Sequence, residues 1–346
     1  MTRVAITMGD PAGVGPELCL AALSAFADDS GITPIIVGDL AILRRVASTL
    51  GTTIPDVRVW VPDEFEQRWN ACVADSGQQS PEFEPGIIDV QAIEVGQFTP
   101  GTIGPSTGRA AYTYLKRAID WTMRGLVDAI VTGPIHKEAL ALAGIDYPGH
   151  TEILAERTGT AKYCMMLTSP EITCSLVTTH IGFRDIVGQL SADKILDVLS
   201  LTRDTMSHLR RRDVRLAVCG LNPHGGENGL FGDEEKRIIQ PAVAEARRMG
   251  IDVIGPLPAD TAFVPAVRRE VDAYICMYHD QGLIPLKALA FDEAVNVTLG
   301  LPIIRTSVDH GTALDIAWKG VVRQSSMMHA IRLAAELDRG AEPTNP

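Results

Sequence analysis

Short, almost continuous apolar runs alternate along this chain with longer stretches in which apolar residues recur every three or four positions. Helices are expected near residues 107–124, 191–209, 233–248 and 324–337. A strand that is covered on both faces has an uninterrupted apolar run, and alternation with helices indicates a mostly parallel sheet. The sequence therefore predicts an α/β fold. The predicted strands include residues 3–8, 34–37, 57–61, 129–132, 163–167, 173–178, 214–219, 252–254 and 273–277.

A histidine follows three of these strand-like runs, each within a polar or glycine-rich turn. They are His180 in Thr-His-Ile-Gly, His224 in Asn-Pro-His-Gly-Gly-Glu and His279 in Tyr-His-Asp-Gln-Gly. The carboxyl ends of strands are where α/β proteins place their active sites. Three imidazoles indicate a divalent-metal site that leaves coordination positions open for a substrate. Their spacing matches no compact zinc module, so ordinary structural roles are the alternative.

Composition limits the classes of partner. The net charge is −12 and no basic block is present, so we expect no nucleic-acid partner. No apolar run is long enough to cross a membrane, and the first residues lack the pattern of a secretory signal, so we expect no membrane association. The six cysteines form no Cys-x-x-Cys pair, and four lie inside strand-like runs. Reduced thiols and a cytoplasmic location are therefore expected.

Polar residues at two predicted turns could contact a substrate. Lys137 follows the strand at 129–132, within Thr-Gly-Pro-Ile-His-Lys, and could instead belong to an ordinary helix surface. His150 and Thr151 open a predicted helix, where polar side chains often act only as N-caps.

Three further residues could bind an anion. Lys287 and Arg305 lie in generally apolar surroundings, where an unpaired charge is costly, and Asn296 lies between them. Together they could hold a phosphate or carboxylate. Ordinary solvated charge is the alternative for both cations.

The segment from Asp309 to Ala317 passes from a strand through a glycine-containing turn. Its His310, Gly311, Thr312 and Ala313 resemble the adenosine-binding loop of the isocitrate and isopropylmalate dehydrogenases, which has His-Gly-[Ser/Thr]-Ala at this place. No G-x-G-x-x-G fingerprint is present.

Taken together, these motifs resemble the family of 4-hydroxythreonine-4-phosphate dehydrogenases from about residue 4 to residue 338. The matching segments occur in order: MGDPAGVGPE, TGPIHK, GHTE, TTHIGFRDI, GLNPHGGENGLFGDEE, GPLPADTAF, MYHDQGLIPLK and VNVTLGLPIIRTSVDHGTALDIA. The resemblance implies a two-domain fold like that of the isocitrate and isopropylmalate dehydrogenases, with mostly parallel sheets and a cofactor cleft between the domains. The first domain would comprise residues 1–140 and 306–346, on the nucleotide side. The second, residues 141–305, would carry metal, substrate and dimer contacts.

The resemblance also implies a role for each candidate residue. One divalent ion (zinc, magnesium, cobalt or manganese) would be bound at the interface of a homodimer, and NAD or NADP would be the cofactor. Asp260 would lie close to the reacting carbons, and Asp260 and Lys137 are the two candidates for the catalytic base. The implied metal ligands are His180, His224 and His279; the substrate contacts are His150, Thr151, Lys287, Asn296 and Arg305; the nucleotide contacts are His310, Gly311, Thr312 and Ala313.

The implied reaction is oxidation at C3 and decarboxylation of 4-phosphohydroxy-L-threonine to 3-amino-2-oxopropyl phosphate, a step of pyridoxal phosphate biosynthesis. The alternative is a 4-phospho-D-threonate or 4-phospho-D-erythronate dehydrogenase that yields dihydroxyacetone phosphate and CO2. Residues 147–150 and 227–234 resemble the second group at least as closely, whereas His136 favours the first. A metal-dependent hydrolase or phosphatase is a different class of hypothesis, and the segment 310–313 argues against it. A catalytically silent metabolite-binding protein is a third hypothesis, which the intact ligand, cation and nucleotide motifs disfavour.

Overall fold

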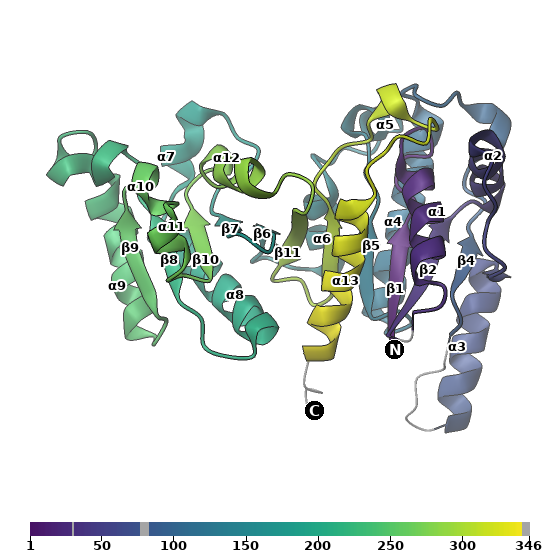
Figure 1. The fold of residues 1–346 in the computed structure, drawn as a ribbon, viewed down its shortest axis with the longest axis horizontal. Helices are drawn as coiled ribbons and strands as arrows, with labels where there is room; N and C mark the ends of the chain where they lie inside the picture. Colours follow the sequence, from purple (N-terminus) through teal and green to yellow (C-terminus); the bar gives the residue numbers. More distant parts are fainter. Residues whose placement is uncertain (30, 77–82, 341–346) are drawn as a thin grey trace. The chain divides into compact units, whose positions relative to one another are not determined.

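The structure, a computed structural model, describes residues 1–29, 31–76 and 83–340 (Figure 1). It divides into two compact units. Unit 1 comprises Met1–Thr160 and Pro302–Arg339, and unit 2 comprises Ala161–Leu301. Both are built from strands that alternate with helices, so the predicted α/β class is confirmed.

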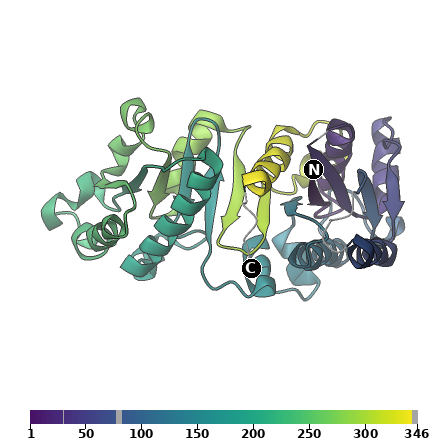
Figure 2. The same cartoon turned by 90° about the horizontal axis from the view of Figure 1, so that it is seen from below.

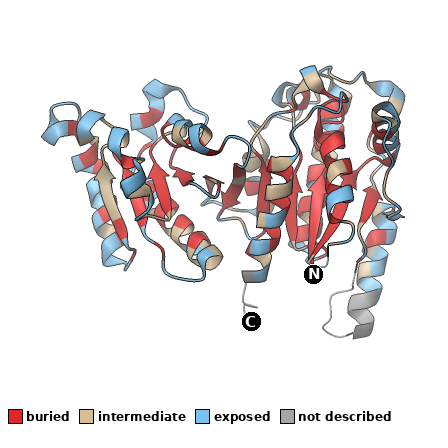
Figure 3. Cartoon of the chain, viewed as in Figure 1, coloured by how far each residue is buried: buried red, intermediate tan, exposed pale blue. Residues whose placement is uncertain are grey.

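Unit 1 contains six parallel strands in the order β3-β4-β2-β1-β5-β12. Every residue of β1, β2 and β5 is buried, as the continuous apolar runs predicted (Figure 3). The strand expected before Asp309 is β12, whereas the sequence analysis did not assign β4 as a strand. The strands are β1 (Thr2–Thr7), β2 (Ile32–Gly38), β3 (Arg58–Trp60), β4 (Gly86–Asp89), β5 (Ala129–Thr132) and β12 (Ile304–Val308).

Helices cover both faces of these strands (Figure 2). The helix expected near 107–124 is α4, which begins with Pro105 in its first turn and buries Ala111, Leu115, Ala118 and Thr122. Short 3₁₀ turns, η1 (Val95–Gln97) and η5 (Leu314–Ile316), lie in the connections. The helices are α1 (Gly15–Phe26), α2 (Leu40–Leu50), α3 (Pro62–Ser76), α4 (Pro105–Met123), α5 (Lys137–Leu142), α6 (His150–Thr158) and α13 (Ser325–Gly340).

Unit 2 contains a mixed sheet in the order β11-β6-β7-β10-β8-β9. The pairs β11–β6 and β6–β7 are antiparallel. In the second pair a tight turn between Thr168 and Thr173 returns the chain directly. The pairs β7–β10, β10–β8 and β8–β9 are parallel. The strands are β6 (Cys164–Thr168), β7 (Thr173–Leu176), β8 (Leu216–Cys219), β9 (Val253–Leu257), β10 (Ala273–Cys276) and β11 (Val295–Leu299).

The longest helix of unit 2, α8, begins as the sequence predicted. The Ser191 hydroxyl accepts a hydrogen bond from the Lys194 backbone N–H, which caps the helix. Beneath the helices, a core of buried apolar residues includes Leu167, Leu176 and Leu286. The helical segments are η2 (Phe183–Asp185), α7 (Ile186–Gln189), α8 (Ala192–Arg210), η3 (Pro223–Gly229), η4 (Glu235–Ile239), α9 (Gln240–Arg248), α10 (Ala259–Ala262), α11 (Pro265–Arg268) and α12 (His279–Ala290).

The limits of the units differ from the expected domain limits. The expected second domain began at residue 141, but residues 141–160 belong to unit 1, because α6 packs against α4 there. The chain returns to unit 1 at Pro302 rather than at 306, because all of β12 pairs with β5. Residues 341–346 of the expected first domain lie outside the described residues. None of the helices in the described ranges is long and apolar enough to span a bilayer.

Candidate functional site

The candidate site residues divide between the two units. Unit 1 holds Lys137, His150, Thr151, Arg305 and the segment 310–313. Unit 2 holds the three histidines of the predicted metal site, together with Asp260, Lys287 and Asn296. Each group is described within its own unit.

Arg305 is a buried cation at the centre of the unit 1 group. It lies in β12, is 2% exposed, and donates through its Nη2 to the hydroxyl of Thr132 at 2.7 Å. Burial lowers the pKa of Arg305 to about 9, and the Glu152 carboxylate opposes this shift. A guanidinium in such surroundings gains strongly from an anionic partner. The surroundings of Arg305 therefore favour a phosphate or a carboxylate.

His150 lies within electrostatic reach of Arg305 and begins helix α6. Its ring donates to the backbone carbonyl of Gly133, and its Nε2 is buried without a hydrogen-bond partner among the described residues. Burial, and secondarily the charge of Arg305, lower the pKa of His150 well below the ordinary value of 6.5. The imidazole is thus neutral, and the bond to Gly133 leaves Nε2 as an acceptor for a substrate hydroxyl or amine. Thr151 is half-buried next to it, whereas Lys137 is exposed at the start of α5.

The segment 310–313 packs against the turn that precedes α1. The Val14 backbone N–H donates to the Thr312 carbonyl at 3.0 Å. A Cβ at Gly13 would lie 2.7 Å from that carbonyl oxygen, so only glycine permits this approach. Farther along the chain, the Glu17 carboxylate accepts hydrogen bonds from the backbone N–H groups of Trp318 and Gly320. The segment that resembles an adenosine-binding loop is therefore held firmly within unit 1.

In unit 2, two of the three candidate metal ligands lie side by side. The ring centroids of His180, after β7, and His279, after β10, are 5.5 Å apart. The Nδ1 of His279 is 2.7 Å from Oδ1 of Asp280, so Nε2 is the nitrogen left to coordinate a cation. A carboxylate on the other ring nitrogen is typical of metal-binding histidines. The pair therefore fits a divalent cation.

His224 does not join this pair within one chain. It lies on a turn in which six consecutive residues, from His224 to Gly229, have positive φ, and its ring centroid is 6.3 Å from that of Phe231. Among the described residues, no three His, Cys, Asp or Glu side chains lie close enough together to hold a metal ion. The assignment of all three histidines to one ion therefore stays a prediction.

The other candidate residues of unit 2 are less enclosed. Lys287 is half-buried in α12, with its Nζ 5.7 Å from the centre of the Phe291 ring. Asn296 lies in β11, and its Oδ1 is buried without a hydrogen-bond partner in the described parts of the chain. Asp260 is exposed in the short helix α10. The structure thus keeps Lys287 and Asn296 in a different unit from Arg305.

The sequence analysis did not single out some residues of these sites. Thr132 and Gly133 contact Arg305 and His150, and Glu152 acts on the charge of Arg305. All three lie inside motifs that the sequence analysis quoted, so a signal was present. The bond from Arg305 of β12 to Thr132 joins positions far apart along the chain, which only the fold reveals.

Comparison with known proteins now identifies the family. A family profile described as "Pyridoxal phosphate biosynthetic protein PdxA" matches residues 30–334. The chain belongs to the PdxA family. It is 44% identical to the D-threonate 4-phosphate dehydrogenase of Salmonella typhimurium, over 96% of this chain and 98% of that protein. It is also 44% identical to the 4-hydroxythreonine-4-phosphate dehydrogenase of Geobacter metallireducens, over 97% of this chain and 96% of that protein.

Solved structures agree with this placement in the PdxA family. The crystal structure of 4-hydroxythreonine-4-phosphate dehydrogenase from Klebsiella pneumoniae superimposes with a TM-score of 0.80 at 39% identity, covering 98% of this chain and 100% of that one. A β-decarboxylating dehydrogenase from Thermococcus kodakarensis shares the fold, with a TM-score of 0.51 at 14% identity over 97% of this chain and 84% of that one. The predicted family and fold are confirmed, and this PdxA protein is a dehydrogenase.

Proposed function

We propose that this PdxA protein oxidises 4-phosphohydroxy-L-threonine at C3 with NAD, or NADP, and releases CO2 to form 3-amino-2-oxopropyl phosphate. The reaction would depend on a divalent metal ion. The observation that carries the proposal is the buried Arg305 in unit 1, beside the neutral His150. The dehydrogenase fold of the PdxA family supports the oxidation step, and the buried guanidinium of Arg305 supports the binding of an anionic substrate.

In this proposal Arg305 and Thr132 bind the anionic end of the substrate, and Lys287 and Asn296 are further proposed substrate contacts. The Nη2 of Arg305 is already oriented by Thr132 at 2.7 Å, so little side-chain entropy is lost when an anion binds. Such fixation would hold C3 of the substrate in a reactive position. His150 and Thr151 would contact the polar groups beyond the phosphate.

The proposed metal ligands are His180, His224 and His279. When bound, a divalent cation such as zinc, magnesium, cobalt or manganese would acidify the C3 hydroxyl and stabilise charge on the oxygen, while the nicotinamide accepts the hydride. Asp280 would fix the tautomer of His279. Asp260 or Lys137 would take the proton of the hydroxyl, and the segment 310–313 would contact the nucleotide.

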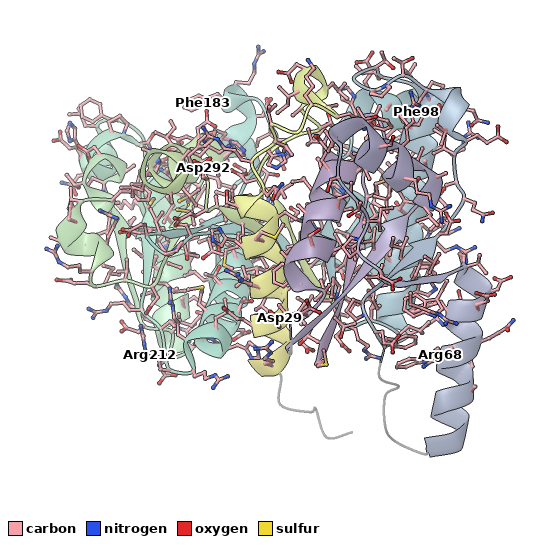
Figure 4. The ribbon with its side chains drawn as sticks, turned by 45° about the vertical axis from the view of Figure 1, so that its right-hand side comes forward. Asp29, Arg68, Phe98, Phe183, Arg212 and Asp292 are labelled. Atoms are coloured by element: carbon pink, nitrogen blue, oxygen red, sulfur yellow. The ribbon has the colours of Figure 1, made fainter. Side chains whose placement is uncertain are left out.

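We infer that two copies of the chain form a homodimer that completes the metal site, with His224 supplied by a second copy. Within one chain only His180 and His279 lie together among the described residues. Unit 2 exposes several large apolar side chains, and exposed apolar surface is a feature of protein–protein contacts. One of them, Phe183, is 76% exposed (Figure 4). The others include Ile181, Val187, Leu230, Phe231, Ile284 and Phe291.

A second candidate substrate is 4-phospho-D-threonate, which carries a hydroxyl in place of the amine. The 44% identity to the Salmonella D-threonate 4-phosphate dehydrogenase favours it as much as the Geobacter relative favours the first. Both substrates carry the phosphate that Arg305 would bind. We also propose that the enzyme works in the cytoplasm, where its buried free thiols (Cys19, Cys164, Cys174, Cys219 and Cys276) stay reduced.

The test is a spectrophotometric assay of NADH and NADPH formation with 4-phosphohydroxy-L-threonine, 4-phospho-D-threonate and 4-phospho-D-erythronate, each with and without EDTA. We expect one of the phosphorylated acids to give reduced nicotinamide and CO2 in equal amounts. EDTA should stop the reaction, and added metal should restore it. Release of inorganic phosphate without reduction of NAD would contradict the proposal and favour a phosphatase.

A further inference from the structure

Two parallel strands of unit 2, β8 and β10, are joined beyond their last paired residues by one buried side chain. Gln281 is 5% exposed and lies in the first turn of α12. Its Oε1 accepts from the backbone N–H of Met277, after β10, at 2.6 Å. Its Nε2 donates to the carbonyl of Gly220, after β8, also at 2.6 Å. The amide of Gln281 therefore bridges the carboxyl ends of β10 and β8.

The same line of hydrogen bonds continues to the third strand. The carbonyl of Met277 accepts from the hydroxyl of Thr178, after β7, at 2.7 Å. Thr178 is 2% exposed, so this bond is also shielded from water. The line from Thr178 through Met277 and Gln281 to Gly220 thus fixes the lateral spacing of three strand ends.

Each of these strand ends leads within a few residues to one candidate metal ligand. His180 follows Thr178, His279 follows Met277, and His224 follows Gly220. On the Gly220 side, the buried carboxylate of Glu235 extends the restraint. It accepts from the backbone N–H groups of Leu221 and Asn222, each at 2.7 Å.

We propose that Gln281 is a positioning residue that sets the spacing of the metal-binding histidines by bridging β10 and β8. This inference rests on the metal site of the proposed function. Gly220 donates its own N–H to the Leu257 carbonyl of β9 at 2.7 Å, and its carbonyl accepts from the Gln281 amide, so both of its backbone groups are bonded. Because both ends of that amide are buried and bonded, its loss leaves two backbone groups unsatisfied and lets the strand ends move.

The experiment measures Co²⁺ binding by the full-length protein, by titration against a chelator and by the visible absorption of the bound ion. Gln281→Met keeps the length of the side chain and removes both bonds. Thr202→Val is the matched control, since it removes a buried hydrogen bond in the same unit, from Thr202 to Ser175 of β7, that is no part of the line from Thr178 to Gly220. His279→Ala reports whether the Co²⁺ occupies the proposed site.

We expect Gln281→Met to weaken Co²⁺ binding by about tenfold or more and to change the absorption spectrum of the ion. Thr202→Val should lower the melting temperature without changing either property. If Gln281→Met does not fold, Gln281→Glu replaces it, because the carboxylate still accepts from Met277 but cannot donate to Gly220. Like Gln281→Met, the Gln281→Glu variant should weaken Co²⁺ binding and change the absorption spectrum of the ion.

Unchanged Co²⁺ affinity and spectrum in the Gln281 variant would overturn the positioning role while leaving the metal site intact. Failure of the proposed function would give a different result, in the Co²⁺ binding of His279→Ala or of the unaltered protein. If His279→Ala binds Co²⁺ as the unaltered protein does, or if the unaltered protein binds none, the metal site itself is refuted and the inference falls with it.

Discussion

The two candidate sites differ in how far their side chains are buried and hydrogen-bonded within the fold. In unit 1, Arg305 and Nε2 of His150 are buried, Arg305 donates to the Thr132 hydroxyl, and the His150 ring donates to the Gly133 carbonyl. In unit 2, His180 and His224 are exposed on turns, and a carboxylate contacts the ring of His279. A buried guanidinium favours an anionic ligand and restricts what can bind, whereas exposed imidazoles can recruit a cation and a second copy of the chain. We infer that the first site selects the substrate and the second assembles the chemistry.

The largest effect should come from the unit 2 site. His279→Ala removes one imidazole of the close pair, and we expect turnover to fall by at least about 10³-fold with the fold retained, because charge on the reacting oxygen loses its stabilisation. Steady-state NADH formation and far-UV circular dichroism measure the two properties. A variant that stays active after treatment with a chelator would refute the metal role.

The next effect should come from the unit 1 site. Arg305→Met should lower kcat/KM by about 10²-fold, because the anion loses its buried charged partner. Inorganic phosphate should raise the melting temperature of the unaltered protein but not of the variant. A variant whose melting temperature still responds to phosphate would place the anion elsewhere.

A smaller effect tests how His279 is oriented. Asp280→Asn should weaken metal binding by about 10-fold to 100-fold, since the partner of Nδ1 loses its charge. The control is Asp204→Asn, which breaks an exposed ion pair with Arg203 on α8. Isothermal titration calorimetry with Zn²⁺ or Co²⁺ compares the metal affinities of the two variants. Equal affinities would exclude an orienting role for Asp280.

The smallest effect concerns stability and pH. The pKa of His150 is depressed in the folded state, so below the ordinary value of 6.5 the unfolded chain binds more protons than the folded one. The free energy of unfolding should therefore fall as the pH decreases from 6.5, and His150→Asn should make that fall less steep. Urea unfolding at several pH values measures it. Parallel curves for the two proteins would show that His150 is not the group responsible.

The sequence predicted the fold class because buried strands and helices have different apolar patterns, and β1, β2 and β5 follow those patterns closely. It did not assign β4 (Gly86–Asp89) as a strand, because this short apolar run lies in a polar stretch rich in proline and glycine. It placed three histidines at strand ends correctly. It could not predict that only His180 and His279 lie together in one chain, since that depends on the conformation of the 224–228 turn.

The contacts of Gln281 illustrate the same limit. Its motif, Tyr-His-Asp-Gln-Gly, is visible in the sequence, but the bond to Gly220 joins strands that are distant along the chain. The anion site has the same property, because Arg305 and Thr132 meet only when β12 pairs with β5. The sequence indicates which residue types carry the chemistry, whereas strand order determines which of them share a site.

Mixing two inactive variants tests the central claim, that a metal shared between two copies supports the dehydrogenase reaction. His224→Ala and His279→Ala subunits would be prepared separately, mixed in equal amounts, allowed to exchange, and assayed for NADH formation. We expect each variant alone to be inactive and the mixture to recover about a quarter of the unaltered activity, since half of the dimers then contain one intact site of two. An inactive mixture, in which subunit exchange has been demonstrated, would contradict the account.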